Sequence, residues 1–395
     1  MDASEDSLNP VTIDWQNDEN HILLNPRWSE KDSAGLCKVA QTITQRRNLQ
    51  GHLWLATSGS TSEAVGQIKL VALSKKAFQV SALAVNKHLQ ANSSDVWLQV
   101  LPRFHVGGLG VEVRAHLSGS RVVCDFEKWN PERIHKNLSD NKITIASMVP
   151  TQVFDLVQAG LQSPKSLRAV IVGGGALTEG LYQQARKLNW PLLPSYGMTE
   201  TCSQIATASL ESLQSSAMPL PQKLSHVEWR ADTEGLLQVR GESLLTCYGQ
   251  RQKDGKIVDW DPKIDGWFPT EDFVKLQDLS IRFTGRKNDF IKIGGESSSM
   301  GRLREIFERV VAAVDSSVSQ QVALVDAPSE RLATEIHLVT SLQGKDQLLS
   351  QLEDNFNQEV LPFERIREVK YITGIPRSDL GKVLWAQMKR ELYGR

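Results

Sequence analysis

The stretch ITIASMVPTQVFDLVQAGLQSPKSLRAVIVGG, residues 143–174, sets the architecture of the chain. Its two ends, 143–150 and 167–174, are short and mostly apolar, as is typical of strands that are buried on both faces. The amphipathic residues between them predict a helix that begins near Thr151. A strand, a helix and a second strand in this order form a βαβ unit, whose two strands lie parallel in one sheet.

The same alternation of apolar runs and amphipathic segments continues on both sides of this stretch. Further strands are predicted over residues 53–58, 96–102 and 121–126. Helices are expected where a capping residue precedes an amphipathic segment, after Ser74, Asn130 and Thr178. The sequence therefore predicts an α/β fold, with a large N-terminal domain of helix-covered, mostly parallel sheets.

Two other patterns follow toward the C-terminus. Residues 226–284 contain hairpin-like pieces, which predict a β subdomain of the large domain. After Gly285 come a helix, two strands, a long helix, a strand and a last helix, which predict a small α+β unit. We therefore expect two domains, residues 1–287 and residues 288–395.

Composition narrows the class of protein. The 395 residues include 45 Lys and Arg and 46 Asp and Glu, and the net charge of −1 argues against nucleic-acid partners and anionic membranes. The N-terminus lacks a secretion signal, and no apolar run approaches the roughly 20 residues that span a bilayer. The four cysteines lie too far apart for a zinc cluster, and a reducing, cytoplasmic location without stable membrane insertion is expected.

A run of hydroxyl residues around one glycine, residues 57–62, follows the first predicted strand. Such a loop can direct backbone N–H groups and hydroxyls at phosphate oxygens. Taken alone, the pattern equally suits an ordinary polar turn. It is not a Walker A loop, because no GK[ST] closes it, and no GxSxG motif indicates a nucleophile elbow.

Six further motifs follow in order along the chain. They are LPRFHVGG (101–108), GGGA (173–176), SYGMTET (195–201), DGWFPTED (265–272), TGRKNDFIKIGGE (284–296) and PRSDLGK (376–382). This ordered set resembles the adenylate-forming superfamily of acyl-CoA synthetases, luciferases and peptide-synthetase adenylation domains, and the resemblance runs from about Leu53 to about Lys389. It implies that ATP activates a carboxylic acid as an acyl-adenylate, which then passes to the thiol of CoA with release of AMP and pyrophosphate.

Within this superfamily, SGST (58–61), SMVPTQ (147–152) and the short chain are most similar to o-succinylbenzoate–CoA ligases of menaquinone or phylloquinone synthesis. The implied partners are thus a small carboxylic acid, ATP with Mg²⁺, and CoA. Other aryl- or acyl-CoA ligases, and enzymes that load a carrier protein, share the same motifs. A nucleotide-binding pseudoenzyme is a further alternative, because the phosphate loop is altered.

The resemblance implies specific contacts with ATP and Mg²⁺. Glu200 would contact Mg²⁺, and Asp272 would accept hydrogen bonds from the ribose hydroxyls beside Arg286. A glycine turn and Tyr196 would form the adenine slot. The full expected set for ATP and CoA is Thr57, Ser58, Gly59, Ser60, Thr61, Gly174, Gly175, Tyr196, Gly197, Thr199, Asp272, Arg286, Lys292, Gly294 and Gly295.

The resemblance also implies a mobile C-terminal lid. Lys382 would reach from the lid to the α-phosphate and the attacking carboxylate. Rotation about Asn288, where many relatives have Asp or Lys, would then bring residues 291–296 to the pantetheine channel. His105 would position the acid or control thiol access rather than transfer a proton. The acid pocket is expected to include Gly107, Gly108, Thr151, Met198 and Ser203.

The chain departs from the superfamily pattern in its phosphate loop and its start. The loop lacks the usual proline, and Lys69 aligns with the superfamily's lysine only if a few residues are inserted. Only 56 residues precede the loop, which suggests that part of the usual N-terminal subdomain is absent. In the segments assigned to the acid pocket, the one arginine is Arg103. We therefore expect hydroxyls, amides, water or backbone N–H groups, rather than an ion pair, to meet a second substrate carboxylate.

Overall fold

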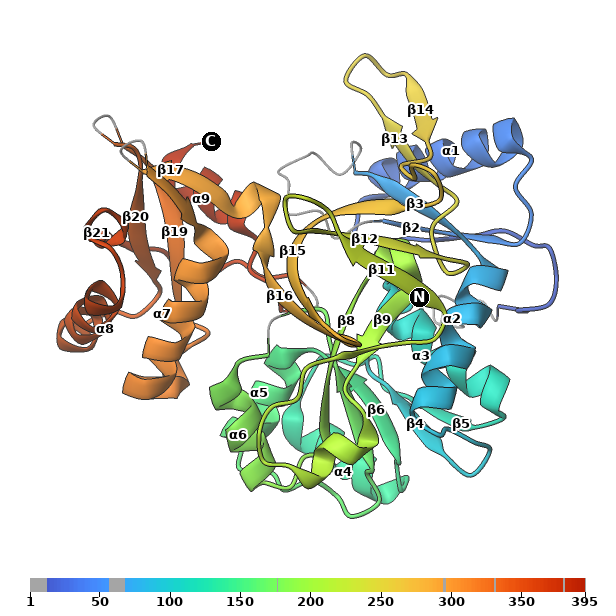
Figure 1. Ribbon diagram of the computed structural model, residues 1–395, viewed down its shortest axis with the longest axis horizontal. Coiled ribbons are helices and arrows are strands. Elements are labelled where there is room, and N and C mark those ends of the chain that lie inside the picture. The colour runs from blue at the N-terminus through green and yellow to red at the C-terminus, as the bar shows by residue number, and fades with distance from the viewer. Residues whose placement is uncertain are drawn as a thin grey trace, which may run out of the picture.

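The computed structural model describes residues 13–56, 68–175, 177–293, 296–329, 332–378 and 381–394. Two bodies are evident, a larger one formed by the N-terminal and central residues and a smaller one formed by the C-terminal residues (Figure 1). The chain passes from the larger body to the smaller one after residue 286.

The larger body is built on an eleven-stranded sheet of β4 (Val96–Gln99), β5 (Arg121–Cys124), β6 (Ile145–Met148), β7 (Ala169–Val172), β8 (Leu192–Met198), β9 (Ser203–Thr207), β10 (Gln222–Lys223), β11 (Val227–Ala231), β12 (Leu236–Gly241), β15 (Phe268–Gln277) and β16 (Ser280–Arg286). Their order is β11-β12-β15-β16-β10-β9-β8-β7-β6-β4-β5. The pairs from β5 to β8 are parallel, as predicted. From β8 onward, each strand pairs antiparallel with the next.

A second sheet contains β1 (His21–Leu23), β2 (His52–Ala56), β3 (Leu70–Ser74), β13 (Cys247–Arg251) and β14 (Ile257–Trp260), in the order β1-β2-β3-β13-β14. Residues 226–284, which the sequence grouped as one β subdomain, are therefore divided between two sheets. Strand β13 pairs antiparallel with β3, whereas β11, β12, β15 and β16 extend the main sheet. Local alternation predicts strands but does not reveal which distant strand each one pairs with.

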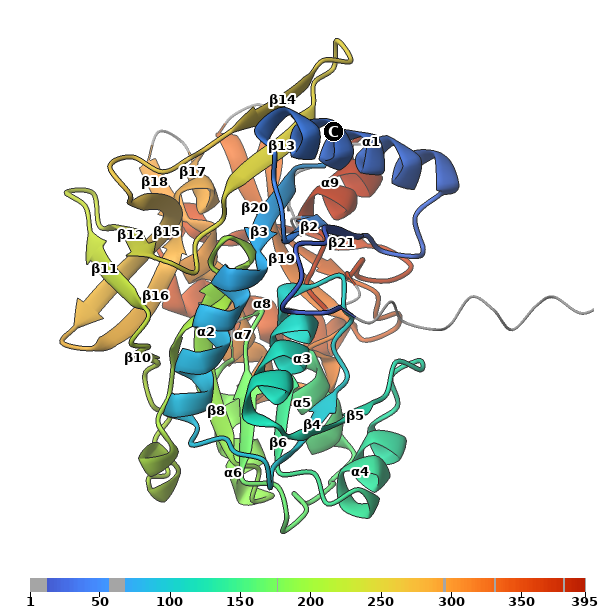
Figure 2. The same ribbon diagram turned by 90° about the vertical axis from the view of Figure 1, so that its right-hand side faces the viewer.

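Helices pack on both sheets of the larger body. They are α1 (Glu30–Arg47), α2 (Lys75–His88), α3 (Val106–Ser118), α4 (Pro131–Asp140), α5 (Pro150–Gln158) and α6 (Glu179–Lys187). Apolar residues of α4, α5 and α6 pack on one face of the main sheet, and those of α2 and α3 pack on the other. Helices α2 and α3 lie side by side between the two sheets (Figure 2), and α1 covers the outer face of the second sheet. This arrangement confirms the predicted α/β class.

Three of the four predicted helix starts are confirmed. The side chains of Ser74, Asn130 and Thr178 each cap a helix by accepting a hydrogen bond from a backbone N–H in its first turn. The prediction for Thr151 was wrong by one residue: α5 begins at Pro150, whose fixed φ suits the first helical position. Helix α3 was not predicted, because its glycine-rich start has low helix propensity.

The elements of the smaller body follow the predicted order from its first helix onward, after two strands that were not predicted. They are β17 (Phe290–Ile293), β18 (Glu296–Ser299), α7 (Met300–Asp315), β19 (Val322–Ser329), β20 (Ala333–Thr340), α8 (Asp346–Glu359), β21 (Ile366–Tyr371) and α9 (Trp385–Tyr393). Strands β19, β20 and β21 form one sheet. Helices α7 and α8 share a core with one face of this sheet, and α9 packs on the other face.

Two general properties bear on the class of protein. In the parts of the chain that the structure describes, no helix combines the length and the apolarity needed to cross a lipid bilayer. All four cysteines fall within the described residues, and all four are free thiols.

The core of the smaller body gives a stability prediction. Phe356 is fully buried, and its ring meets that of Phe307 edge to face at a centroid distance of 5.8 Å. We expect Phe356→Ala to lower the free energy of unfolding of this body by about 3–5 kcal/mol, because it leaves a cavity. Urea denaturation should show a change of about 0.5 kcal/mol or less for the exposed Leu361→Ala. Equal shifts for the two variants would contradict the assigned core.

Candidate active site

The buried carboxylate of Asp272 joins three strands of the main sheet. Arg286 lies opposite Asp272 in the β15–β16 pairing, and its Nε donates to Oδ1 at 2.7 Å. The Tyr196 hydroxyl, at the end of β8, donates to Oδ2 at 2.6 Å. Burial and the Asp272 charge raise the pKa of Tyr196 well above its usual value, so the phenol remains a donor. The structure thus brings together three of the predicted nucleotide-binding residues.

Glu200 lies immediately after β8, in a 3-10 turn that begins at Thr199. The hydroxyl of Tyr248, on β13, donates to Glu200 Oε1 at 2.7 Å. Burial and the Glu200 charge raise the pKa of Tyr248, which keeps its proton on the phenol. Sequence reasoning missed Tyr248, because nothing in its local pattern shows that β13 meets this turn.

Lys69 lies next to the same cluster. Its ammonium Nζ is 3.9 Å from the centroid of the Tyr248 ring, at the point where the chain enters β3. The altered loop therefore still leads to a lysine beside the tyrosine that holds Glu200.

The carboxylate of Glu200 suits Mg²⁺ better than a metal that requires a cage of protein ligands. Within the described ranges, no three His, Cys, Asp or Glu side chains gather as a metal-binding group. Mg²⁺ commonly keeps several waters and takes one or two carboxylates together with substrate phosphates. One fixed carboxylate oxygen and one further oxygen on Glu200 fit that pattern.

The backbone around Glu200 is unusually tight. Ser203, at the start of β9, has φ 109°, in a region that non-glycine residues rarely occupy. Strand β8 runs so close to it that a Cβ at Gly197 would lie 2.0 Å from the Ser203 carbonyl oxygen. Gly197 is therefore required by this close approach, whether or not it also contacts nucleotide.

The expected adenine slot lies where β7 and β8 end. Gly174 and Gly175 follow β7 and are exposed, and β7 pairs in parallel with β8, which carries Tyr196. The Tyr196 ring stacks against Phe283 with a centroid distance of 6.4 Å and an interplanar angle of 30°. The predicted glycine turn and aromatic residue are thus on adjacent strands.

Lys382 reaches this cluster from the smaller body. It closes a turn in which the Ser378 N–H donates to the Lys382 carbonyl at 2.8 Å and Ser378 Oγ accepts from the Lys382 N–H at 3.2 Å. The residue is exposed, yet partial desolvation and then the charge of Arg286 lower its pKa, while Asp272 and Glu200 oppose that shift. The ammonium therefore lies within electrostatic range of three predicted site residues.

Thr151 contacts the smaller body. A Cβ at Gly381, the residue before Lys382, would lie 2.2 Å from Thr151 Oγ1. Gly381 also has φ +71°, so a larger residue is excluded by both contact and conformation. The observed contact of Thr151 is therefore with this turn, whereas the sequence assigned Thr151 to the acid pocket.

Arg114, on α3, is the main feature that sequence reasoning missed. Its side chain is fully buried, and Nη2 donates to Ser203 Oγ at 3.1 Å. Its Nε has no hydrogen-bond partner, and no carboxylate among the described residues lies within ion-pair distance. Burial lowers the pKa of Arg114 to about 9, so the guanidinium still carries its charge at neutral pH. Burying a cation without a counter-charge destabilises the folded protein, so binding of an anion beside Arg114 would be favourable.

His226 is a second polar group without partners in this region. Neither of its ring nitrogens has a hydrogen-bond partner among the described residues. Burial, followed by the Arg114 charge, lowers the pKa of His226 to about 4, so its imidazole is neutral near pH 7. Arg114 and His226 thus both retain unused hydrogen-bonding groups.

The arginine that the sequence did single out has a different partner. Arg103 donates from Nε and Nη2 to the two carboxylate oxygens of Glu112, each at 2.7 Å. Glu112 and Arg114 both lie on α3. Arg103 therefore remains the one arginine of the segments assigned to the pocket, and Arg114 reaches the predicted pocket residue Ser203 from outside them. An arginine in a mostly apolar helical segment was the signal that could have identified Arg114.

The remaining predicted pocket residues are distributed around α3 and β8. His105 is the N-cap residue of α3, and its ring lies against that of Phe104, with a centroid distance of 4.6 Å. Gly107 and Gly108 form the first turn, and Gln99 Nε2 donates to the Gly108 carbonyl at 3.1 Å. Met198 ends β8 and is partly buried against the core. The same helix thus carries the expected pocket entrance and Arg114.

Several predicted residues lie outside what the structure describes. Thr57, Ser58, Gly59, Ser60 and Thr61 of the phosphate loop, and Gly294 and Gly295, are not among the described residues. For Lys292, in β17, and for Asn288 only the backbone is described. Their assigned roles remain predictions.

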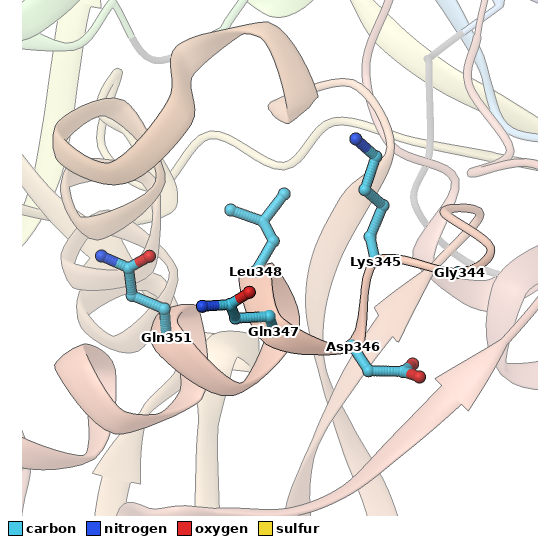
Figure 3. A pocket seen from close by; sticks show the side chains of 6 residues that line it. All are labelled: Gly344, Lys345, Asp346, Gln347, Leu348 and Gln351. Atoms are coloured by element: carbon cyan, nitrogen blue, oxygen red, sulfur yellow. The ribbon is translucent and has the colours of Figure 1, made fainter.

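A separate cavity of about 310 Å³ lies on the smaller body at the start of α8 (Figure 3). It is lined by Gly344, Lys345, Asp346, Gln347, Leu348 and Gln351. None of the predicted site residues contributes to it. The candidate active site is therefore defined by the converging side chains, not by this cavity.

Known proteins resemble the chain in sequence and in structure. The model of the AMP-binding enzyme family matches residues 32–248, more than half of the chain. A 2-succinylbenzoate–CoA ligase of Bacillus licheniformis is 32% identical over 251 residues, which cover 61% of this chain and 51% of that relative. The chain thus spans about half the length of this curated relative.

Two solved structures share the fold. The o-succinylbenzoate CoA synthetase (MenE) from Bacillus subtilis, in complex with the acyl-adenylate intermediate OSB-AMP, has a TM-score of 0.70 at 21% identity and covers 94% of this chain and 88% of that one. ATP-bound MatB from Rhodopseudomonas palustris has a TM-score of 0.71 at 21% identity, with coverage of 86% and 68%. These likenesses confirm the predicted fold class.

The Asp272 cluster gives a binding prediction. Asp272→Ala removes a charged acceptor whose loss typically costs about 1.5–3 kcal/mol per hydrogen bond, so we expect AMP to bind at least about 10-fold more weakly. Isothermal titration should show unchanged affinity for Asp254→Ala, an exposed acid in the turn before β14. A folded Asp272→Ala variant with normal AMP affinity would refute the ribose assignment.

Proposed function

Because the chain belongs to the AMP-binding enzyme family, we propose that it is an ATP-dependent acid–CoA ligase. The observation that carries this proposal is the position of Lys382, a residue of the smaller body, within range of Glu200, Asp272 and Arg286. Attack of a carboxylate on the α-phosphate of ATP brings two anions together. An enzyme for this step needs fixed cations and aligned reactants at that point.

The first step would form an acyl-adenylate with release of pyrophosphate. Asp272, with both oxygens oriented by neighbours, would accept hydrogen bonds from the ribose, and Tyr196 would form one wall of the adenine slot. Glu200 would hold Mg²⁺, which neutralises phosphate charge when bound. Lys382 Nζ would donate to the α-phosphate and to the attacking carboxylate. Residues 57–62, with Lys69, would hold the remaining phosphates.

The second step would transfer the acyl group to the thiol of CoA. We propose that residues 1–287 and 288–395 are separate domains and that the smaller one rotates about residue 288. Rotation would withdraw Lys382 and bring the β17–β18 hairpin to the pantetheine channel. Separate cores on the two sides of the boundary support such a movement.

For the acid, we propose o-succinylbenzoate, which carries two carboxylates. One carboxylate reacts, and the other needs a donor inside the pocket. The buried Arg114 guanidinium, hydrogen-bonded to Ser203, supplies such a donor and would itself gain the anion that it lacks. The name of the Bacillus licheniformis relative supports the same substrate.

We also propose a cytoplasmic location and the menaquinone pathway as the context. Four free thiols suit a reducing compartment. The proposed partners are small molecules: the acid, ATP and CoA.

The acid panel is the central test of this function. The protein should catalyse ATP–pyrophosphate exchange and CoA-ester formation with o-succinylbenzoate, but poorly with benzoate, 4-phenylbutyrate or medium-chain fatty acids. Preference for a monocarboxylic acid would overturn the substrate, and transfer to a carrier protein alone would overturn the CoA step. Exchange with none of the acids would favour the pseudoenzyme.

Replacing Arg114 tests the carboxylate assignment within the same panel. Truncating one partner of a buried charge pair costs about 2–5 kcal/mol, so Arg114→Gln should lower kcat/KM for o-succinylbenzoate by at least about 30-fold. Activity with benzoate should change far less, because benzoate has no second carboxylate. Arg121→Gln, at an exposed position, is the control. An equal loss for both acids would point to a structural role for Arg114.

Replacing Lys382 separates the two steps. Lys382→Ala should lower the rate of adenylation by about 10²–10³-fold, because one charged donor is lost from the transition state. Thioester formation from pre-made acyl-adenylate should persist. Lys345→Ala, an exposed lysine of the same body, serves as the control. An equal fall in both steps would contradict the two-position account.

A further inference from the structure

Arg377 lies five residues before Lys382 and braces the turn that carries it. Its Nη1 donates to the Gly381 carbonyl at 2.9 Å, and its backbone forms an antiparallel bridge with Val383. Its Nε is buried and has no hydrogen-bond partner among the described residues. The guanidinium therefore supports the turn from inside and retains donor capacity for another group.

The larger body meets this turn through one face of α5. Thr151 and Asp155 are four residues apart, so they lie on the same side of the helix. Thr151 Oγ1 touches the position of Gly381, as described above. Asp155 lies one helical turn further along; it forms no ion pair with Arg377 within 4.0 Å, but the two charges shift each other's pKa at longer range. On this face of α5, Thr151 therefore lies beside Gly381, and Asp155 lies on the same side as Arg377.

Asp155 is held in place by a second element. The indole N–H of Trp129 donates to Asp155 Oδ2 at 2.8 Å. Burial raises the pKa of Asp155, while the Trp129 hydrogen bond and the Arg377 charge act in the opposite direction. A carboxylate that is partly desolvated and oriented in this way interacts with a nearby cation more strongly than a solvated one.

The charge of Arg377 is shared between the two bodies. Glu308, on α7, also interacts with it, and Glu308 belongs to the same body as the arginine. Only Asp155 belongs to the larger body. Any movement of the smaller body relative to α5 therefore changes the Asp155–Arg377 interaction but leaves the Glu308–Arg377 interaction within its own unit.

We propose that Asp155 and Arg377 form a docking pair that holds the Lys382 turn against α5 and so positions Lys382 for adenylation. Neither residue touches the reacting atoms, and both act through Lys382. The inference rests on the proposed two-step reaction. When the smaller body rotates for the second step, the pair separates, so its contribution is confined to the first step.

The experiment compares the two half-reactions in charge variants. Asp155→Asn keeps an acceptor for Trp129 but removes the charge. We expect it to lower kcat for ATP–pyrophosphate exchange by about 10-fold, with little change in KM for ATP, and to leave thioester formation from pre-made acyl-adenylate unchanged. Asp155→Arg should lower exchange further, and adding Arg377→Asp to it should restore part of the loss. Glu132→Gln, an exposed acid on the neighbouring α4, is the matched control.

Hydrogen exchange provides a measurement that is independent of activity. Backbone amides of residues 377–383 should exchange faster in Asp155→Asn than in the wild type, whereas Glu132→Gln should not differ. Normal adenylation and unchanged amide exchange in Asp155→Asn would overturn the docking pair, as would an equal loss in both half-reactions without rescue in the double variant. Absence of wild-type activity with every acid would instead refute the proposed function, and the amide exchange would still test the docking.

Discussion

The site depends on a carboxylate that is hydrogen-bonded at both oxygens. Asp272 receives Tyr196 from β8 and Arg286 from β16, and these strands are far apart in the sequence. The three residues can meet because the sheet changes from parallel to antiparallel pairing after β8 and folds the later strands back beside it. Loops that follow the carboxyl ends of parallel strands are common ligand sites, and here the added antiparallel strands supply the acid and its arginine.

A second constraint is the balance of charge around that site. Arg286 and Arg114 are guanidinium groups, and that of Arg114 carries its charge at neutral pH, whereas the carboxylates of Asp272 and Glu200 are already hydrogen-bonded to other groups. Among the described residues, Arg114 therefore has no carboxylate that neutralises its charge. A buried cation without a counter-charge lowers the stability of the folded chain but favours the binding of an anionic ligand. This trade-off is usual where function requires polar groups in a core.

The parts of the fold that could be predicted are those in which the local pattern of residues directly reflects how they pack. Buried parallel strands are apolar throughout, and Ser74, Asn130 and Thr178 cap the helices that they precede, so the βαβ region followed directly. Tyr248 and Arg114 could not be assigned in the same way. Tyr248 contacts Glu200 only because β13 pairs with β3, and Arg114 lies on a helix whose glycine-rich start concealed it. The contact between Thr151 and Gly381 could not be predicted either, because it depends on how two units meet.

The short connection between the bodies limits how the smaller one can travel. Arg286, which holds Asp272, is separated from residue 288 by a single residue, and two steps of extended chain span only about 7 Å. The smaller body is thus tethered almost directly to the arginine that holds the Asp272 carboxylate. A tether of this length lets the smaller body pivot about its end but not move away. Either face of the smaller body can therefore turn toward the site while its effective concentration there stays high.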